Sequence, residues 1–152
     1  MSGLFATDLP RLHALLYTDG ASRGNPGASG WGAALLAAHD HAVIAKACGA
    51  LPDTTNNVAE YTGALEGVRL ALKHGVTDLE IRADSQLIIR QLTGEYRIKA
   101  AHLLPLAVEI RKLLAQFVFW RAVHIPREQN KLADRLSNDG ADEAERLYHR
   151  RR

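Results

Sequence analysis

Short apolar runs occupy the first third of the chain and follow one another closely. They cover residues 12–18, 31–38 and 43–50, with the polar residues 39–41 between the second and the third. Runs of this length joined by short polar turns are typical of antiparallel strands. The pattern therefore predicts a three-stranded meander, followed by a loop over the proline-containing polar residues 51–57.

Beyond this loop, apolar positions recur every three or four residues, which indicates a helix. One face of it carries Val58, Tyr61, Leu65, Val68 and Leu72. Asn56 or Asn57 is expected to cap its start, and Gly75 its end. Further elements are predicted as a strand over 79–83, helices over 85–92 and 103–117, a strand over 118–125, and a helix from 131, capped by Asn130, towards 146. Strands interleaved with helices late in the chain favour a mixed α/β sheet covered by helices.

Composition adds little to this picture. The 152 residues suit one domain, 1–152, with a core over about 12–147 and loose ends at 1–11 and 148–152. A net charge of +2 permits a polyanionic partner without demanding one. Cys48 is the only cysteine, so no intrachain disulfide forms, and we expect a thiol packed in the core. No signal peptide or membrane span is evident, so the cytoplasm is the expected location.

Four carboxylates stand at the ends of predicted elements. Asp19 and Asp84 end strands, whereas Glu60 and Asp134 lie near helix starts. Acids in such positions can meet at one rim of a sheet, where they would repel one another and raise each other's pKa. A hard divalent cation such as Mg²⁺, which prefers oxygen ligands, relieves that repulsion. Two such ions can activate a water and stabilise the leaving oxygen of a phosphodiester.

Each acid also has a simpler structural interpretation. Glu60 and Asp134 are placed where an acid favours a helix N-terminus. Asp84 can belong to a helix cap, and Asp19 before a glycine can make a turn. These interpretations stay open for each acid singly, but they do not account for the sequence around them.

The residues around the acids resemble type 1 ribonuclease H, from about residue 15 to residue 142. Residues 124–130 further resemble the compact prokaryotic and archaeal branch of that family. The resemblance is carried by Thr18-Asp19-Gly20, Gly24-Asn25-Pro26-Gly27, Gly30-Trp31-Gly32, Thr55-Asn56-Asn57-Val58-Ala59-Glu60-Tyr61, Ala83-Asp84-Ser85-Gln86, and Asn130 with Ala133-Asp134.

The resemblance implies a ribonuclease H-like, five-stranded mixed sheet whose strands 1–3 are antiparallel and which is flanked by helices. It implies an endonuclease that hydrolyses the RNA strand of an RNA–DNA hybrid and leaves 5′-phosphate and 3′-hydroxyl ends. Two Mg²⁺ or Mn²⁺ ions are implied, with Asp19 touching both. The implied partner is the hybrid duplex, with neither a membrane nor a protein partner. The matching metal ligands are Asp19, Glu60, Asp84 and Asp134.

Substrate-binding positions also follow from the resemblance. Asn25, Asn56 and Gln86 match contacts to the minor groove and to RNA 2′-hydroxyls, which amides can recognise. Thr55 and Asn57 match the surroundings of a DNA phosphate contact. The basic protrusion of some members is absent over residues 94–99, which leaves a smaller DNA contact. The remaining nucleic-acid-binding candidates are Arg97, Lys99 and Asn130.

A further catalytic position is open between two residues. Many members of the family place a mobile histidine before the last acid. His124 has suitable spacing but falls on the predicted last strand. Arg127 falls in the following loop, where a cation can bind a phosphate oxygen. The sequence favours Arg127.

Two other functions compete with catalysis on a hybrid. The fold also occurs in inactive domains, so a hybrid-binding module is one alternative, although all four acids are present. A nucleotide-binding phosphotransferase is the other. The glycine-rich stretch of small residues 20–30, between the first two predicted strands, is expected to form a loop whose backbone N–H groups can approach an anionic ligand closely. That stretch lacks the Lys-Ser/Thr ending of a P-loop, which argues against it.

Overall fold

The computed structural model describes residues 10–149, in which one sheet has the strand order β3-β2-β1-β4-β5. Strands β1 to β3 are antiparallel neighbours, whereas β1–β4 and β4–β5 pair in parallel. This confirms the predicted mixed sheet. The strands are β1 (His13–Arg23), β2 (Gly27–Ala37), β3 (Val43–Thr54), β4 (Asp78–Ala83) and β5 (Phe119–His124), and the helices are α1 (Asn56–Lys73), α2 (Gln86–Leu92), α3 (Leu104–Leu114) and α4 (Lys131–Tyr148).

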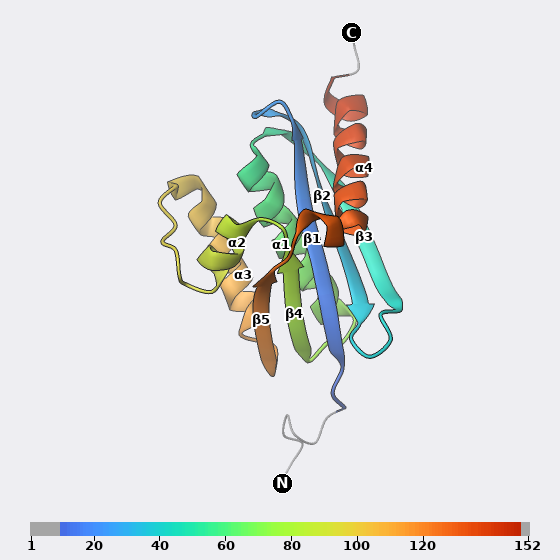
Figure 1. Cartoon of the computed structure of the whole chain (residues 1–152). Coiled ribbons are helices and arrows are strands. Elements are labelled where there is room, and N and C mark those ends of the chain that lie inside the picture. The colour runs from blue at the N-terminus through green and yellow to red at the C-terminus, as the bar shows by residue number, and fades with distance from the viewer. Residues whose placement is uncertain (1–9, 150–152) are drawn as a thin grey trace.

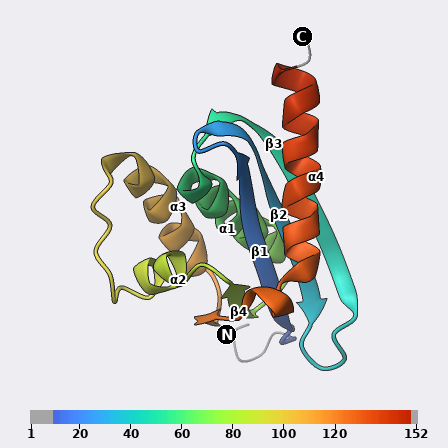
Figure 2. The ribbon, with the colours of Figure 1, turned by 45° about the horizontal axis from the view of Figure 1, so that its top comes forward.

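Helices cover the two faces of the sheet unequally. Figures 1 and 2 show α1, α2 and α3 on one side and α4 alone on the other, lying along β1, β2 and β3. The short 3₁₀ helices η2 (Ala101–Leu103) and η3 (Arg127–Gln129) lead into α3 and α4. No helix among residues 10–149 is long and apolar enough to cross a membrane.

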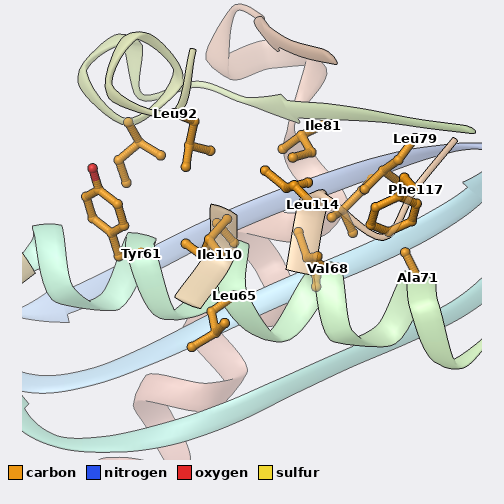
Figure 3. Close-up of a cluster of buried hydrophobic side chains, with 14 of the residues drawn as sticks. Tyr61, Leu65, Val68, Ala71, Leu79, Ile81, Leu92, Ile110, Leu114 and Phe117 are labelled. Atoms are coloured by element: carbon orange, nitrogen blue, oxygen red, sulfur yellow. The ribbon is translucent and has the colours of Figure 1, made fainter. Parts of the chain in front are cut away.

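The main core lies between the sheet and α1 to α3. Figure 3 shows the side chains of α1 meeting those of β4, α2 and α3. Tyr61, Val68 and Ile110 are fully buried there. The apolar face predicted for α1 is confirmed, except that Val58 and Leu72 at its margins are only partly buried. Burial of this apolar surface is the main stabilising contribution to the fold.

The glycine-rich stretch forms a hairpin, where a longer loop was expected. β1 continues to Arg23 and β2 begins at Gly27, with Asp19 paired to Gly32 in the ladder. Only the turn at residues 24–26 remains outside the strands. The small residues that suggested a loop are needed here because helices approach the strands closely.

The loop expected over residues 51–57 is also shorter than predicted. β3 runs through Pro52 to Thr54, which an edge strand tolerates because one of its sides needs no ladder hydrogen bonds. The side chain of Thr55 caps α1 by accepting from the backbone N–H of Val58, so the prediction of Asn56 or Asn57 as the cap is wrong. The other elements match within a few residues at their ends.

Three smaller predictions are also corrected. Cys48 lies on the edge strand β3 and is exposed, so the expected thiol packed in the core is wrong. Arg11, placed in a loose end, donates to Asp78 through Nε at 2.8 Å and holds the pKa of that carboxyl at about 2. His149, which was also placed in a loose end, lies with a ring nitrogen 2.5 Å from an oxygen of Asp53. Residues 1–9 and 150–152, which belong to the ends that we expected to be loose, lie outside the described residues.

Gly32 brings α4 close to the sheet. A Cβ on Gly32 would lie 2.6 Å from both the carbonyl oxygen of Ala133 and the backbone nitrogen of Ser137. We expect Gly32→Ala to lower the free energy of unfolding by about 1–3 kcal/mol, because α4 must shift outward. Urea unfolding measures this change. An unchanged midpoint would show that α4 does not depend on this close contact.

Candidate active site

The sheet brings three of the four acids to one rim. Tyr17 of β1 pairs with Arg82 of β4, so the same parallel register sets Asp19 beside the position of Asp84, just past the end of β4. Glu60 comes from the start of α1, which crosses β1 at Gly20. A Cβ on Gly20 would lie 2.4 Å from the backbone nitrogen of Glu60.

These three carboxylates form a tight cluster. One oxygen each of Asp19, Glu60 and Asp84 lies within 4.8 Å of the others. The side chain of Asp19 is buried, and those of Glu60 and Asp84 are half-buried. Their convergence confirms the geometric expectation for three acids. The close crossing of α1 over β1 is the physical cause, and glycine is required there because any side chain would strike the helix backbone.

Burial and mutual repulsion raise the pKa values in the cluster. Desolvation, followed by the charge of Asp84, raises the pKa of Asp19 to about 8, against a hydrogen bond from the backbone N–H of Gly20. The same two causes raise the pKa of Glu60 to about 7, against a hydrogen bond from Ser85 and the charge of Arg127. Such a set of crowded carboxylate oxygens fits a hard divalent cation, which would stabilise their charged forms.

Asp134 lies farther out than the other three acids and is not part of the tight cluster. It is exposed in the first turn of α4. It nevertheless faces the same polar pocket of about 330 Å³, which Asp19, Glu60 and Arg127 also line. Its charge contributes to the raised pKa of Asp19. Asp134 therefore shares this pocket with Asp19 and Glu60, whereas Asp84 does not line it, so the expectation that all four acids adjoin is met only in part.

Asn130 is buried, which corrects its assignment to nucleic acid binding. Its exposed fraction is 0%, so it cannot reach a duplex on the surface. Its side-chain NH₂ donates to the carbonyl of Thr18 at 3.0 Å and to Oδ2 of Asp84 at 3.2 Å. The sequence suggested that Asn130 caps α4. It stands at the N-cap position but makes no capping hydrogen bond through its side chain. It holds Asp84 in place from the junction between η3 and α4.

The two candidates for an additional catalytic group occupy different surroundings. Arg127, in η3, lines the acidic pocket and its charge acts on Glu60. His124 is exposed at the end of β5, opposite Ala83, and does not line that pocket. The position of Arg127 in the pocket therefore agrees with the preference for it over His124. Its role in catalysis stays a prediction.

The polar residues predicted to bind substrate surround the cluster in two groups. Asn25 accepts at 2.9 Å from the backbone N–H of Asn56, and Asn56 lines the acidic pocket. Asn57, Arg97 and Lys99 instead line a second groove of about 500 Å³.

Residues 93–100, where the sequence predicts that the protrusion is absent, contain no helix or strand and join α2 to η2. Gln86 is exposed at the start of α2, two residues after Asp84. Thr55 uses its hydroxyl oxygen as the cap of α1.

Two residues at the site were missed in the sequence. Asn138 lines the acidic pocket and contacts Asp134, which lies one helical turn earlier. Ser85 caps α2 and donates towards Glu60. The spacing of four residues between Asp134 and Asn138 is a signal that sequence reading could have used, because such residues are neighbours on a helix.

A five-stranded mixed sheet with a carboxylate cluster beside its central strand defines a ribonuclease H-like nuclease fold. The family model described as reverse transcriptase-like matches residues 17–140. Ribonuclease HI of Halobacterium salinarum is 40% identical over 136 residues, which cover 88% of this chain and 66% of the relative. Ribonuclease H of Pseudomonas syringae is 33% identical and covers 88% of this chain and 95% of the relative. The chain belongs to the type 1 ribonuclease H family.

Solved structures agree with this family. The N-terminal ribonuclease H domain of Rv2228c from Mycobacterium tuberculosis superposes with a TM-score of 0.86 at 38% identity, over 90% of this chain and 98% of that one. LC11-RNase H1 in complex with an RNA/DNA hybrid has a TM-score of 0.81 at 34% identity, over 86% and 98% of the two chains. The chain spans only 36% of the length of the whole bifunctional mycobacterial protein, to which it is 39% identical.

Proposed function

We propose that this protein is a metal-dependent endonuclease that hydrolyses the RNA strand of RNA–DNA hybrids and leaves 5′-phosphate and 3′-hydroxyl ends. The convergence of Asp19, Glu60 and Asp84 within 4.8 Å carries the proposal, because no packing need explains three crowded carboxylates at a rim. Family membership and the hybrid complex of a 34% identical relative support it. The cytoplasmic location expected from the sequence stays a prediction.

Asp19, Glu60, Asp84 and Asp134 are the proposed metal ligands. When bound, two Mg²⁺ or Mn²⁺ ions would supply the Lewis acidity that activates a water and stabilises the leaving oxygen. The charges of all three other acids act on Asp19, which comes from the central strand and is the proposed shared ligand. Glu60 also faces the pocket that Asn56 lines, where it can contact a ribose hydroxyl.

Arg127 is proposed to bind a phosphate oxygen of the RNA strand. It projects a fixed positive charge into a pocket lined by acids. It therefore compensates for the approach of an anionic backbone to the carboxylates. His124, at the end of β5, is the weaker candidate for this step because it does not line the pocket.

The amides around the cluster are proposed to recognise ribose. Because Asn25 uses its oxygen to accept from Asn56, its NH₂ is left to donate. The orientation of Gln86 that satisfies its neighbours places Oε1 at 2.8 Å from Nη2 of Arg90, which again leaves the NH₂ outward. Two outward NH₂ donors suit the 2′-hydroxyl oxygens and minor-groove acceptors of a hybrid.

The DNA strand is proposed to follow the second groove. Asn57, Arg97 and Lys99 line it together with Tyr96. The positive charges of Arg97 and Lys99 and the exposed ring of Tyr96 favour contact with a sugar-phosphate backbone. Contacts of this kind weaken with added salt, because counterions are released on binding.

Asp84→Asn tests the proposed activity. The variant keeps the shape of the side chain but removes one charge, and we expect cleavage of a labelled hybrid in Mg²⁺ to fall on the order of a thousandfold. Asp139→Asn, which changes an exposed acid elsewhere on α4, is the matched control and should cleave normally. A chelator should abolish the wild-type reaction. Unimpaired cleavage by the Asp84 variant would overturn the metal assignment, and binding without any cleavage by the wild type would favour a binding module.

A further inference from the structure

Asp134 differs from the other three acids in its exposure, because Asp19 is buried and Glu60 and Asp84 are half-buried. It is exposed, so its carboxylate would otherwise rotate freely at the edge of the pocket. Asn138, one turn later on α4, reaches back to it. Nδ2 of Asn138 donates to the backbone carbonyl of Asp134 at 2.9 Å and lies 3.4 Å from its Oδ1.

Arg23 determines which way the Asn138 amide faces. Its Nη2 lies 3.2 Å from Oδ1 of Asn138 and 3.2 Å from the backbone carbonyl of that residue. A guanidinium can only donate, so it engages the amide oxygen and leaves the NH₂ directed at Asp134. Arg23 is itself held by Glu145 and Asp142, each at 2.9 Å from Nη1.

The resulting chain of contacts crosses from the end of β1 to the active site. Arg23 is the last residue of β1, which also carries Asp19. The contacts therefore tie the outlying carboxylate to the strand that holds the central one. Because Asn138 is a neutral donor, it orients Asp134 without neutralising its charge, and it leaves Oδ2 unengaged by either residue.

We propose that Asn138, oriented by Arg23, is a positioning residue that holds Asp134 ready to complete the metal site. The proposal rests on the proposed function only in taking Asp134 as a metal ligand. Neither residue touches the substrate or the reacting atoms in this proposal. Outer-sphere partners of metal ligands commonly change metal affinity tenfold or more, which gives the expected size of the effect.

Asn138→Ala tests this inference through metal binding. We expect the dissociation constant for Mn²⁺, measured on the hybrid-free protein by electron paramagnetic resonance, to rise about tenfold. The Mg²⁺ concentration for half-maximal hybrid cleavage should rise by a similar factor, with little change in rate at saturating Mg²⁺. Arg23→Ala should act in the same direction with a smaller effect. Asp139→Ala, at the next exposed position of α4, is the matched control and should bind Mn²⁺ normally.

A double variant separates positioning from a general loss of structure. In an Asp134→Ala background, Asn138→Ala should cause no further loss of Mn²⁺ affinity, because the carboxylate on which it acts is gone. Equal losses in the two backgrounds, or unchanged Mn²⁺ binding in the single variant, would overturn the inference. Absence of hybrid cleavage by the wild type would overturn the proposed function instead, and would leave the Mn²⁺ measurement decisive for this inference.

Discussion

Replacing Asp19 by asparagine is expected to reduce hybrid cleavage at least about a thousandfold and to stabilise the metal-free protein. The loss of activity follows from removing the central carboxylate of the cluster. The gain in stability follows from burial and from the charge of Asp84, which raise the pKa of Asp19 to about 8. Replacing Asp19 is therefore expected to increase the free energy of unfolding of the metal-free protein, although it removes a residue of the site.

The stability change has a definite pH dependence. Below pH 3.8, the ordinary value for the side chain, Asp19 is protonated in both states and the substitution changes little. As the pH rises from there to about 8, the unfolded chain ionises while the folded chain holds the proton, so the wild type loses stability relative to the variant. Each pKa unit corresponds to about 1.4 kcal/mol, and partial hydration of the rim limits the expected gain to on the order of 2–4 kcal/mol.

Urea unfolding in chelator at pH 4, 6 and 8 measures this difference. Saturating Mg²⁺ should reverse the order at pH 8, because metal binding stabilises only the protein that retains its ligands. Asp139→Asn removes an exposed acid and is the matched control. A variant of Asp19 that is less stable than the wild type at pH 8 without metal would contradict the assignment of repulsion in the cluster.

Asn130→Asp is expected to destabilise the protein strongly, although it keeps the shape of the side chain. The substitution replaces the NH₂ that donates to Thr18 and Asp84 with an acceptor and adds a buried charge beside Asp84. We expect a loss of about 2–4 kcal/mol of stability and at least a tenfold loss of cleavage. The new carboxyl has a raised folded pKa, so the stability loss should grow as the pH rises from about 4.

Gln129→Glu provides the matched control for this change. It adds the same charge one residue earlier, at an exposed position, and should alter stability by less than about 0.5 kcal/mol. Thermal unfolding at pH 5 and pH 8 and cleavage at saturating Mg²⁺ separate the two effects. Equal behaviour of the two variants would show that the contacts of Asn130 do not hold Asp84.

Much of the site was predictable because its chemistry depends on residue type. Asp19, Glu60 and Asp84 lie at the ends of elements whose apolar patterns are clear. The motifs around these acids indicated that they belong to one metal site. Asn130 was misassigned for the opposite reason. An asparagine before a helix is equally suited to a cap, a surface contact or a buried donor, and only its complete burial distinguishes these roles.

The glycines show where local pattern misled. The stretch from Gly20 to Gly32 has the composition of a loop, and we expected it to admit a ligand. Gly20 and Gly32 instead lie under the backbones of α1 and α4. Close packing between segments that are distant in sequence depends on which helix crosses which strand, and no local propensity encodes it.

The sequence by itself determined the α/β class, the order of the elements, and the four acids, because periodicity and residue chemistry are local properties. The tertiary structure alone decided that three acids form a tight cluster while Asp134 stays at its edge, and that Asn130 and Asn138 hold two of them. Those relations depend on how closely α1 and α4 approach β1 and β2. That approach is determined by side-chain volume at the crossing points, where Gly20 and Gly32 carry none.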